Sequence, residues 1–275
     1  MTAPDSTAWQ TPDGPWFIAE VSSNHATDLD RCLAFVDLAA DTGCTAVKFQ
    51  LFKIDKLFAP EILAQSERHR ARRAWELPEA FLPDIAARAR ARGIAFACTP
   101  FDLEAVAALR DHVDFYKIAS YELLWLDLVR AAAARDAGCR DLTVLHCISH
   151  YPASAAEANL AAIGTLRAAL GCAIGWSDHT TDPAVIHRAV HRWGAGAIEC
   201  HVDLEGEGAE FAAGHCWLPD DLRRVIAEIG RGAGADGDGA KGPVPAEAEE
   251  REWRADPEDG LRPLKYLRTT WKAAS

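Results

Sequence analysis

The sequence lacks the features of a membrane, secreted or nucleic-acid-binding protein. It has 29 Lys and Arg against 41 Asp and Glu, a formal net charge of -12 at pH 7, whereas phosphate backbones and acidic lipids are bound by basic patches. No run reaches the roughly 18 apolar residues of a membrane span, and the start, MTAPDSTAWQTPDG, has neither the basic end nor the apolar core of a signal peptide. We therefore expect a cytoplasmic protein with no nucleic-acid or membrane partner. A local cluster of lysines can still bind a small anion.

The sequence also lacks paired cysteines. Its eight Cys stand singly, at positions 32, 44, 98, 139, 147, 172, 200 and 216, with no CxxC motif, and most lie in apolar runs. In a chain of this size we expect buried, reduced thiols in place of a disulfide framework.

What the sequence does contain is an alternation of short apolar runs with Ala-, Leu- and Arg-rich helical stretches, the pattern of parallel βα units. Its 275 residues match one (β/α) barrel of about 250 residues. The expected strands cover residues 16–19, 46–51, 94–99, 115–119, 143–148, 173–177 and 197–202. We therefore predict an α/β protein, a (β/α) TIM-type barrel with seven recognisable strands instead of eight.

The missing strand falls between Lys117 and Thr143. This interval has room for one helix, at 123–137, but not for a further strand and helix, because such a unit takes about 25 to 30 residues by itself. We expect an open or distorted barrel in which the strand at Phe115 is the direct neighbour of the strand at Thr143.

Three segments lie outside this pattern. Residues 52–78, with the charged sequence ERHRARR, are long for a βα connection and predict a lid or helical excursion above the active-site face. We assign residues 1–230 to the catalytic barrel and the Gly-rich residues 231–246 to a flexible linker. Residues 247–275, with Trp253 and Trp271, form a C-terminal tail that we expect to dock on the barrel.

Polar residues end nearly every expected strand, and the active site of a parallel barrel lies at these ends. Lys48 and Lys117 are costly inside apolar strands unless paired. They predict a cationic site for a phosphate or carboxylate, and the alternative is a buried structural salt bridge. Hydroxyl groups at Thr99, Ser120 and Ser177 could donate further hydrogen bonds to anionic oxygens.

Two histidines, His179 and His201, end successive strands and could converge on one metal ion. Each alone would more often be a hydrogen-bonded core residue. Glu20 and Glu199 are possible ligands or acid and base groups. His187 and His191 form a competing pair at the i, i+4 spacing of a helical metal site. They lie on a helix flanked by arginines, and we expect this helix on the outside of the barrel.

The motifs FIAEVSSNH, AVKFQLF, ACTPFD, FYKIASYE, VLHCISHYP, GWSDHT and AIECHVDLEG, in this order over residues 17–206, resemble the sialic acid (N-acetylneuraminate) synthases and related nonulosonic acid synthases. The resemblance implies a condensation of phosphoenolpyruvate with an N-acyl sugar aldehyde, similar to N-acetylmannosamine, that gives a sialic or nonulosonic acid and phosphate. It also implies a divalent metal, typically Mn2+, with Mg2+ as a possible substitute, and a possible homodimer.

Carried over by position, the resemblance places the metal on His179 and His201. The predicted catalytic residues are Glu20, Lys48, Lys117 and Glu122. The predicted substrate-binding residues are Asn24, Gln50, Thr99, Phe101, Ser120, Ser149, Tyr151, Ser177, Asp178, Glu199 and Glu210.

The sequence departs from the family pattern in three places. The fifth strand, which ends in a Ser-Thr-Gly motif, has no counterpart between Glu122 and Leu142. We also expect this chain to lack the antifreeze-like C-terminal domain that gives an Arg to the partner subunit's sugar site, so that Arg254 or Arg262 would supply this cation. After the last strand, GEGAEFAAGHCWLP offers Glu210 as the acidic sugar contact.

Two other functions remain open. A pseudoenzyme or ligand-binding barrel could keep these residues and have lost turnover with its fifth βα unit. A metal-dependent sugar isomerase or epimerase would use the two histidines but leaves the two strand-end lysines without a task.

Overall fold

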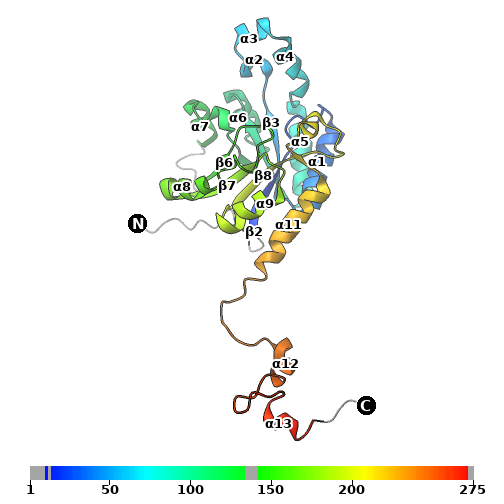
Figure 1. Ribbon diagram of the computed structural model, residues 1–275. Coiled ribbons are helices and arrows are strands. Elements are labelled where there is room, and N and C mark those ends of the chain that lie inside the picture. Colours follow the sequence, from blue (N-terminus) through cyan, green and yellow to red (C-terminus); the bar gives the residue numbers. More distant parts are fainter. Residues whose placement is uncertain (1–9, 12–13, 134–141, 272–275) are drawn as a thin grey trace. The chain divides into compact units, whose positions relative to one another are not determined.

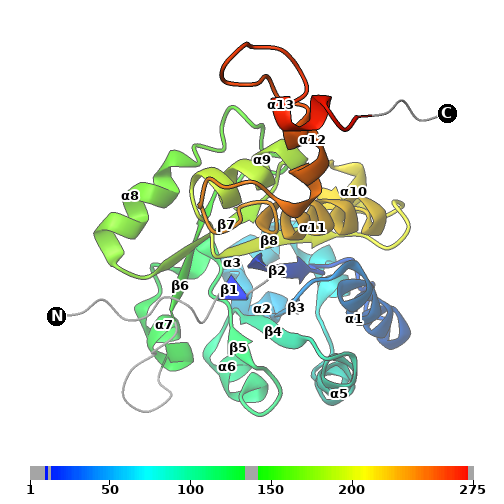
Figure 2. The same ribbon diagram turned by 90° about the horizontal axis from the view of Figure 1, so that it is seen from below.

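Seven parallel strands form the central sheet of the computed structural model, which describes residues 10–11, 14–133 and 142–271. The strands are β2 (Gly14–Glu20), β3 (Ala46–Leu51), β4 (Ala95–Pro100), β5 (Phe115–Tyr116), β6 (Thr143–Cys147), β7 (Ala173–Asp178) and β8 (Ala197–Val202). They follow the order β5-β4-β3-β2-β8-β7-β6 around the barrel, whose end is seen in Figure 2. Two further strands of two residues each pair off this path, β1 (Gln10–Thr11) with β2 and β9 (Cys216–Trp217) with β8. The predicted seven-stranded barrel is confirmed.

The barrel is open between β5 and β6. These strands stand at the two ends of the sheet order, and no pairing joins them within the described residues. Every residue of both is partly exposed, whereas five of the six residues of β3 are buried. The prediction that these strands pair directly is therefore wrong for the described part of the chain. The reason is that β5 ends after two residues and the chain turns into the 3-10 helix η4 (Ser120–Glu122).

Large apolar side chains are exposed beside this opening. They follow β5 or precede β6, and they are Tyr121, Leu123, Leu124, Trp125, Leu126 and Leu142, with 41 to 93% of each side chain exposed. The helix predicted at 123–137 is observed as α7 (Leu126–Ala133), and its last four predicted residues lie outside the described chain.

The helices cover the outside of the sheet (Figure 1). They are α1 (Leu29–Thr42), α5 (Leu82–Arg92), α6 (Leu103–Leu109), α8 (Ala161–Leu170), α9 (Pro183–His187) with its π-helical continuation η5 (Arg188–Arg192), and α11 (Pro219–Ala233). Asp28 and Asp102 cap α1 and α6, since their carboxylates accept hydrogen bonds from the backbone amides of Arg31 and Ala105.

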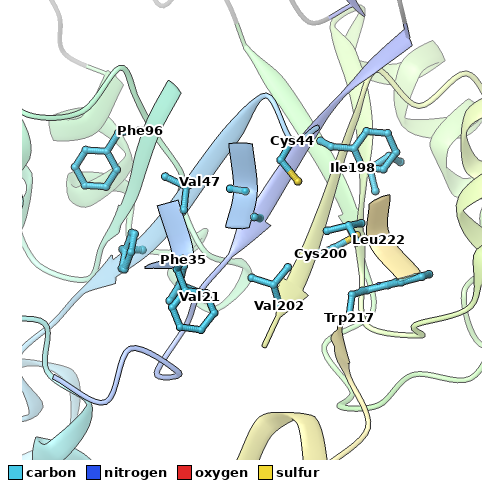
Figure 3. Packing of buried hydrophobic residues seen from close by; sticks show 14 of the residues in the cluster. Val21, Phe35, Cys44, Val47, Phe96, Ile198, Cys200, Val202, Trp217 and Leu222 are labelled. Atoms are coloured by element: carbon cyan, nitrogen blue, oxygen red, sulfur yellow. The ribbon is translucent and has the colours of Figure 1, made fainter. Parts of the chain in front are cut away.

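The apolar core lies between the strands and these helices (Figure 3). Phe35 of α1, Val47 of β3 and Phe96 of β4 are almost completely buried, as are Ile198 and Cys200 of β8. Seven cysteines are free, five of them buried, as expected for reduced thiols. The eighth, Cys139, lies outside the described residues.

The predicted lid is helical. It consists of α2 (Ile54–Leu57), α3 (Pro60–Gln65), α4 (Glu67–Arg70) and the 3-10 helices η2 (Ala71–Trp75) and η3 (Glu79–Phe81). These short helices stand beyond the end of β3 in Figure 1. Hydrogen bonds fix the lid at both ends, from Thr27 Oγ1 to the carbonyl of Ala74 at 2.7 Å and from the amide of Ile54 to Glu76 Oε1 at 2.8 Å.

The chain divides into two compact units, Met1–Ala233 and Gly234–Ser275. The second unit contains η6 (Pro245–Glu247), α12 (Ala248–Glu252) and α13 (Lys265–Arg268). In this unit Trp253 packs edge-on against Trp271, with ring centroids 6.2 Å apart. Because α11 continues to Ala233, the chain is helical over the first three residues of the predicted linker. Docking of the tail on the barrel stays a prediction.

None of the described helices has the length and apolarity needed to cross a membrane.

Candidate active site

A pocket of about 880 Å³ opens at the carboxyl ends of the strands. It is lined by most of the predicted site residues, namely Glu20, Lys48, Gln50, Thr99, Phe101, Lys117, Ser120, Glu122, Tyr151, Ser177, His179, Glu199, His201 and Glu210. Its wall continues past Val129 and residues 142–145, so the pocket reaches the open side of the barrel. The strand-end pattern thus predicted residues that meet in one pocket.

Three predicted substrate-binding residues do not line the pocket. The amide of Asn24 donates to the carbonyl of Val202 at 2.9 Å, and Asp178 accepts hydrogen bonds from the indoles of Trp176 and Trp217, both at 3.0 Å. These two side chains hold the barrel together. Ser149 is exposed, and its hydroxyl is 3.0 Å from that of Ser120.

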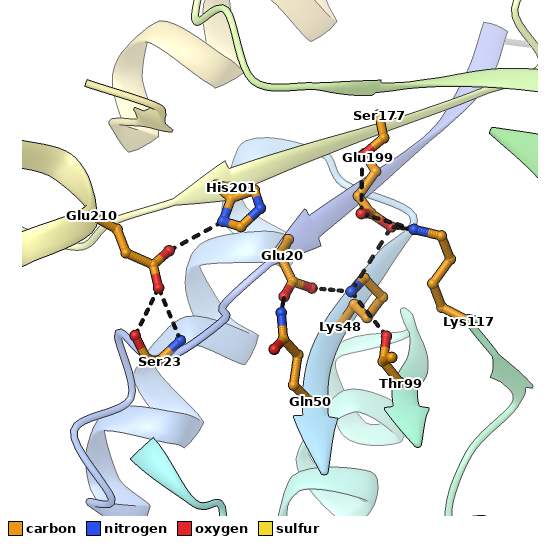
Figure 4. A network of polar contacts seen from close by, with 10 residues as sticks. All are labelled: Glu20, Ser23, Lys48, Gln50, Thr99, Lys117, Ser177, Glu199, His201 and Glu210. Carbon is orange, nitrogen blue, oxygen red and sulfur yellow. Dashed lines mark hydrogen bonds and ion pairs between the residues drawn. The ribbon is translucent and has the colours of Figure 1, made fainter. Parts of the chain in front are cut away.

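The two predicted lysines are both paired with carboxylates (Figure 4). Lys48 forms an ion pair with Glu20, lies 3.9 Å from Glu199 and donates to Thr99 Oγ1 at 3.2 Å. Lys117 donates to both carboxylate oxygens of Glu199, at 2.9 and 3.0 Å. The register of the strands explains this arrangement, since Glu20 of β2 is the partner of Lys48 of β3.

Burial shapes the charge of this network. It would raise the pKa of Glu199, but Lys117 and Lys48 outweigh this effect and lower that pKa to about 2. Burial opposes the charged form of Lys48, yet Glu199 and Glu20 raise its pKa above the usual value. The two lysines therefore fit both alternatives, because they form buried salt bridges and also line a pocket that an anion could enter.

The pocket is not cationic as a whole. Its lining carries three cationic side chains, Lys48, Lys117 and Arg72, against the four carboxylates of Glu20, Glu122, Glu199 and Glu210. A multiply charged anion would thus be bound in a pocket with a small excess of negative charge. A divalent cation in the same pocket would reverse this balance.

The two predicted metal ligands are brought together. The ring centroids of His179 and His201 are 5.3 Å apart, and both residues are buried. His179 Nδ1 lies 2.7 Å from the carbonyl oxygen of Ile148, so this nitrogen carries the proton and donates it. His201 Nδ1 lies 3.1 Å from Glu210 Oε2 and donates to it in the same way. Within the described residues, Nε2 of each ring has no hydrogen-bond partner.

These rings fit a metal ion. Fixing Nδ1 as the donor leaves Nε2 as a free lone pair, which is how histidine ligands are oriented in metal sites. Burial, and to a smaller extent the neighbouring His201, lowers the pKa of His179 to about 4. The ring is therefore neutral at pH 7, as a ligand must be. The ring of Tyr151 packs on His179 with a centroid distance of 4.0 Å.

Glu210, the predicted acidic sugar contact, lines the pocket beside His201. Its Oε1 accepts hydrogen bonds from the amide and hydroxyl of Ser23, at 3.3 and 2.7 Å, while Oε2 lies 3.1 Å from His201 and 3.5 Å from His215 Nε2. Burial would raise the pKa of Glu210, but the hydrogen bonds from the two histidines hold it well below its usual range. Because both oxygens already accept from protein donors, the structure shows Glu210 orienting His201.

Sequence reasoning missed several pocket residues. His215, just before β9, lines the pocket, whereas Cys216, the first residue of β9, lies beside it without lining the pocket. With His201 and Glu210 they bring four possible metal-ligating atoms within 4.8 Å of one another. The adjacent His and Cys in GHCW were the available signal. Arg72 of the lid also lines the pocket, and nothing in ERHRARR distinguishes it from its neighbours.

The competing histidine pair lies elsewhere. The rings of His187 and His191 stack 5.7 Å apart, and His187 Nε2 is 3.2 Å from Glu228 of α11. Neither lines the pocket. They form a contact between outer helices, as predicted.

Comparisons with known proteins agree with the motifs. The sequence profile of the NeuB family matches residues 35–137 and 131–241. N,N'-diacetyllegionaminic acid synthase of Campylobacter jejuni is 30% identical over 263 residues, which cover 82% of this chain and 78% of that protein. Spore coat polysaccharide biosynthesis protein SpsE of Bacillus subtilis is 29% identical over 255 residues, covering 79% of this chain and 67% of that protein.

A solved structure shows the same architecture. The crystal structure of N-acetylneuraminic acid synthetase from Leptospira borgpetersenii, in complex with citrate, matches with a TM-score of 0.71 and 28% identity. The match covers 87% of this chain and 90% of that chain. The fold and the strand-end site define a (β/α)-barrel of the synthase type. The chain belongs to the NeuB family.

Proposed function

We propose that this chain condenses phosphoenolpyruvate with the open-chain form of an N-acyl sugar aldehyde, giving a nonulosonic acid and phosphate. The observation that carries the proposal is the position of the Lys48 and Lys117 network beside two histidines with free Nε2 atoms, in one pocket of a NeuB-family barrel. The relatives' names, legionaminic acid synthase and N-acetylneuraminic acid synthetase, support this class of product.

Phosphoenolpyruvate would bind at the lysines. Lys117 and Lys48 can turn from Glu199 and Glu20 toward the phosphate and carboxylate, and the hydroxyls of Thr99, Ser120 and Ser177 can donate to the same oxygens. The carboxylates of Glu20 and Glu199 hold the two lysines in the pocket before the anion binds. Each lysine would leave its carboxylate when it binds the anion. The paired lysines thus support a preformed subsite for phosphoenolpyruvate.

A divalent cation, which we propose to be Mn2+ with Mg2+ as a substitute, would be held by Nε2 of His179 and His201. When bound, it supplies a Lewis acid that polarises the aldehyde oxygen. Glu210 keeps His201 in the required tautomer, and the carbonyl of Ile148 does the same for His179. Tyr151 covers this face and limits the access of water.

The reaction can be written with its atoms balanced. The methylene carbon C3 of phosphoenolpyruvate attacks the aldehyde carbon, a carbon–carbon bond forms, and the aldehyde oxygen takes up a proton to become a hydroxyl. Water adds to the cationic C2 and loses a proton, and the C2–O bond to phosphate then breaks. Glu20, which accepts from Gln50 at 2.6 Å and pairs with Lys48, is the residue that we assign to proton transfer. Burial raises the pKa of Glu122, which makes it a second candidate acid.

The experiment is incubation with phosphoenolpyruvate, Mn2+ and a panel of N-acyl hexosamines, with phosphate release and product mass as readouts. The proposal expects phosphate release that requires an acceptor, and a product with the mass of the sum of acceptor and pyruvate. A pseudoenzyme would bind phosphoenolpyruvate without releasing phosphate. An isomerase or epimerase would convert the sugar without phosphoenolpyruvate. The matched variants Lys48→Ala and Lys117→Ala should raise the KM for phosphoenolpyruvate more than the KM for the sugar.

A further inference from the structure

Arg72 is the one cationic side chain in the described lining of the pocket that has no carboxylate partner. Lys48 and Lys117 line the same pocket, but each is neutralised by Glu20 or Glu199. Arg72 is partly buried and forms no ion pair with any described residue. A partly desolvated and unneutralised cation that faces a cavity favours an anion there.

The position of Arg72 is fixed without an ion pair. Its guanidinium carbon lies 5.2 Å from the ring centroid of Trp75 and 5.5 Å from that of Phe58, so both rings hold it by cation–π contacts. The lid that carries these residues is tied to the barrel by the hydrogen bond from Thr27 to Ala74. The guanidinium edge remains available to donate hydrogen bonds.

The neighbouring arginines behave differently. Arg70 pairs with Glu67 within the lid, and Arg73 pairs with Asp55. Neither lines the pocket. Arg72 thus lines the pocket, whereas Arg70 and Arg73 form ion pairs outside it. Variants of Arg70 and Arg73 are therefore matched controls for Arg72.

We propose that Arg72, with the rings of Phe58 and Trp75, forms an outer subsite for an anionic substituent, a phosphate or a carboxylate, on the acceptor sugar. The lid stands beyond the strand ends (Figure 1), and the aldehyde would react near Lys48 and Lys117, so we expect Arg72 to meet the end of the sugar that is remote from its aldehyde. The planar guanidinium fork matches both kinds of oxyanion. The pocket of about 880 Å³ has room for two small substrates. This inference deepens the proposed function and rests on it for the identity of the acceptor.

The test compares three acceptors with the full chain, phosphoenolpyruvate and Mn2+: N-acetylmannosamine, its 6-phosphate and the corresponding 6-carboxylate, N-acetylmannosaminuronate. We expect at least about tenfold higher kcat/KM for one or both charged acceptors, and the two arms show whether phosphate or carboxylate is preferred. Arg72→Ala should reduce the charged acceptors to the level of the neutral one, and Arg72→Lys should keep part of the preference. Arg70→Ala and Arg73→Ala should leave the preference unchanged.

Two outcomes would overturn the subsite: a wild-type protein that prefers the neutral sugar, or an Arg72→Ala variant that loses equal activity on all three acceptors. If no acceptor turns over, the proposed function fails, and calorimetric titration then decides on the subsite alone. At least tenfold tighter binding of the 6-phosphate to the wild type than to Arg72→Ala, with unchanged binding of N-acetylmannosamine, supports it. Equal binding of the 6-phosphate by both proteins rejects it.

Discussion

Lys117 donates hydrogen bonds to both carboxylate oxygens of Glu199, at 2.9 and 3.0 Å. The same carboxylate lies 3.9 Å from Lys48 and accepts from Ser177 at 3.2 Å. The buried Glu199 thus interacts with both of the lysines that we predicted from the sequence to form an anion site. Binding of an anion at these lysines must therefore weaken their attachment to Glu199.

Glu199→Gln should release the lysines to an anion. We expect this variant to bind phosphoenolpyruvate several-fold more tightly, because the anion no longer competes with the Glu199 carboxylate for the lysines. It should also be less stable, by about 3 to 5 kcal/mol, since the partner of buried charges has been removed. Thermal unfolding with and without phosphoenolpyruvate measures both effects, and Glu205→Gln, at an exposed carboxylate paired with Arg31, is the control. Weaker binding by Glu199→Gln would contradict the competition.

The same carboxylate predicts a dependence of stability on pH. Its pKa is lowered from 4.5 to about 2 in the folded protein, so the unfolded chain takes up the proton first as the pH falls. The stabilisation by Glu199 is fully present above pH 4.5 and is lost as the pH falls toward 2. Denaturant unfolding at several pH values should show a smaller loss over this range in Glu199→Gln than in the wild type. Identical slopes in the two proteins would show that the ion pairs do not set this pKa.

The metal ligands can be tested by binding alone. His179→Ala and His201→Ala should each lower the affinity for Mn2+ at least tenfold, because each removes a free Nε2 atom. His187→Ala and His191→Ala should bind normally, since these rings lie outside the pocket. Cys216→Ser should also keep its affinity. Loss of binding in Cys216→Ser together with retention in His179→Ala would place the ion in the alternative group of His201, Glu210, His215 and Cys216.

Gly175 of β7 tests the packing of the barrel. A Cβ atom at this position would lie 2.3 Å from the carbonyl oxygen of Ala197 and 2.4 Å from Leu145 Cδ2. Gly175→Ala should therefore destabilise the protein by about 1 to 3 kcal/mol or more, since the clash with a neighbouring strand cannot relax easily. Gly242→Ala, where an added Cβ has no neighbour within 4 Å, is the control. Equal denaturation midpoints for the two variants would contradict the strand packing.

The sequence predicted the seven strands and fourteen of the residues that line the pocket, because both depend on local patterns. Apolar runs give the strands, and the parallel order brings their ends together. The sequence did not predict the hydrogen-bond and ion-pair partners of the polar residues. Glu210 meets Ser23 across 187 positions of the chain, and no local pattern encodes such a contact. β5 is shorter than the predicted strand at 115–119, because the apolar run continues after the strand pairing ends.

Lid residues were the least predictable. The four arginines in ERHRARR have similar neighbours in sequence, and only the fold of the lid separates Arg72 from Arg70 and Arg73. The roles of Arg254 and Arg262, and a homodimer, stay predictions.

The central claim is a condensation in which the bond between C2 and the bridging oxygen of phosphoenolpyruvate breaks. It is tested most directly with phosphoenolpyruvate that carries 18O at this bridging position, incubated with the protein, Mn2+ and an N-acyl hexosamine. Mass spectrometry of the released phosphate reports which bond was cleaved. The account expects the 18O in the phosphate and none in the sugar acid product. Unlabelled phosphate together with 18O in pyruvate would mean hydrolysis at phosphorus and would contradict the proposed synthase.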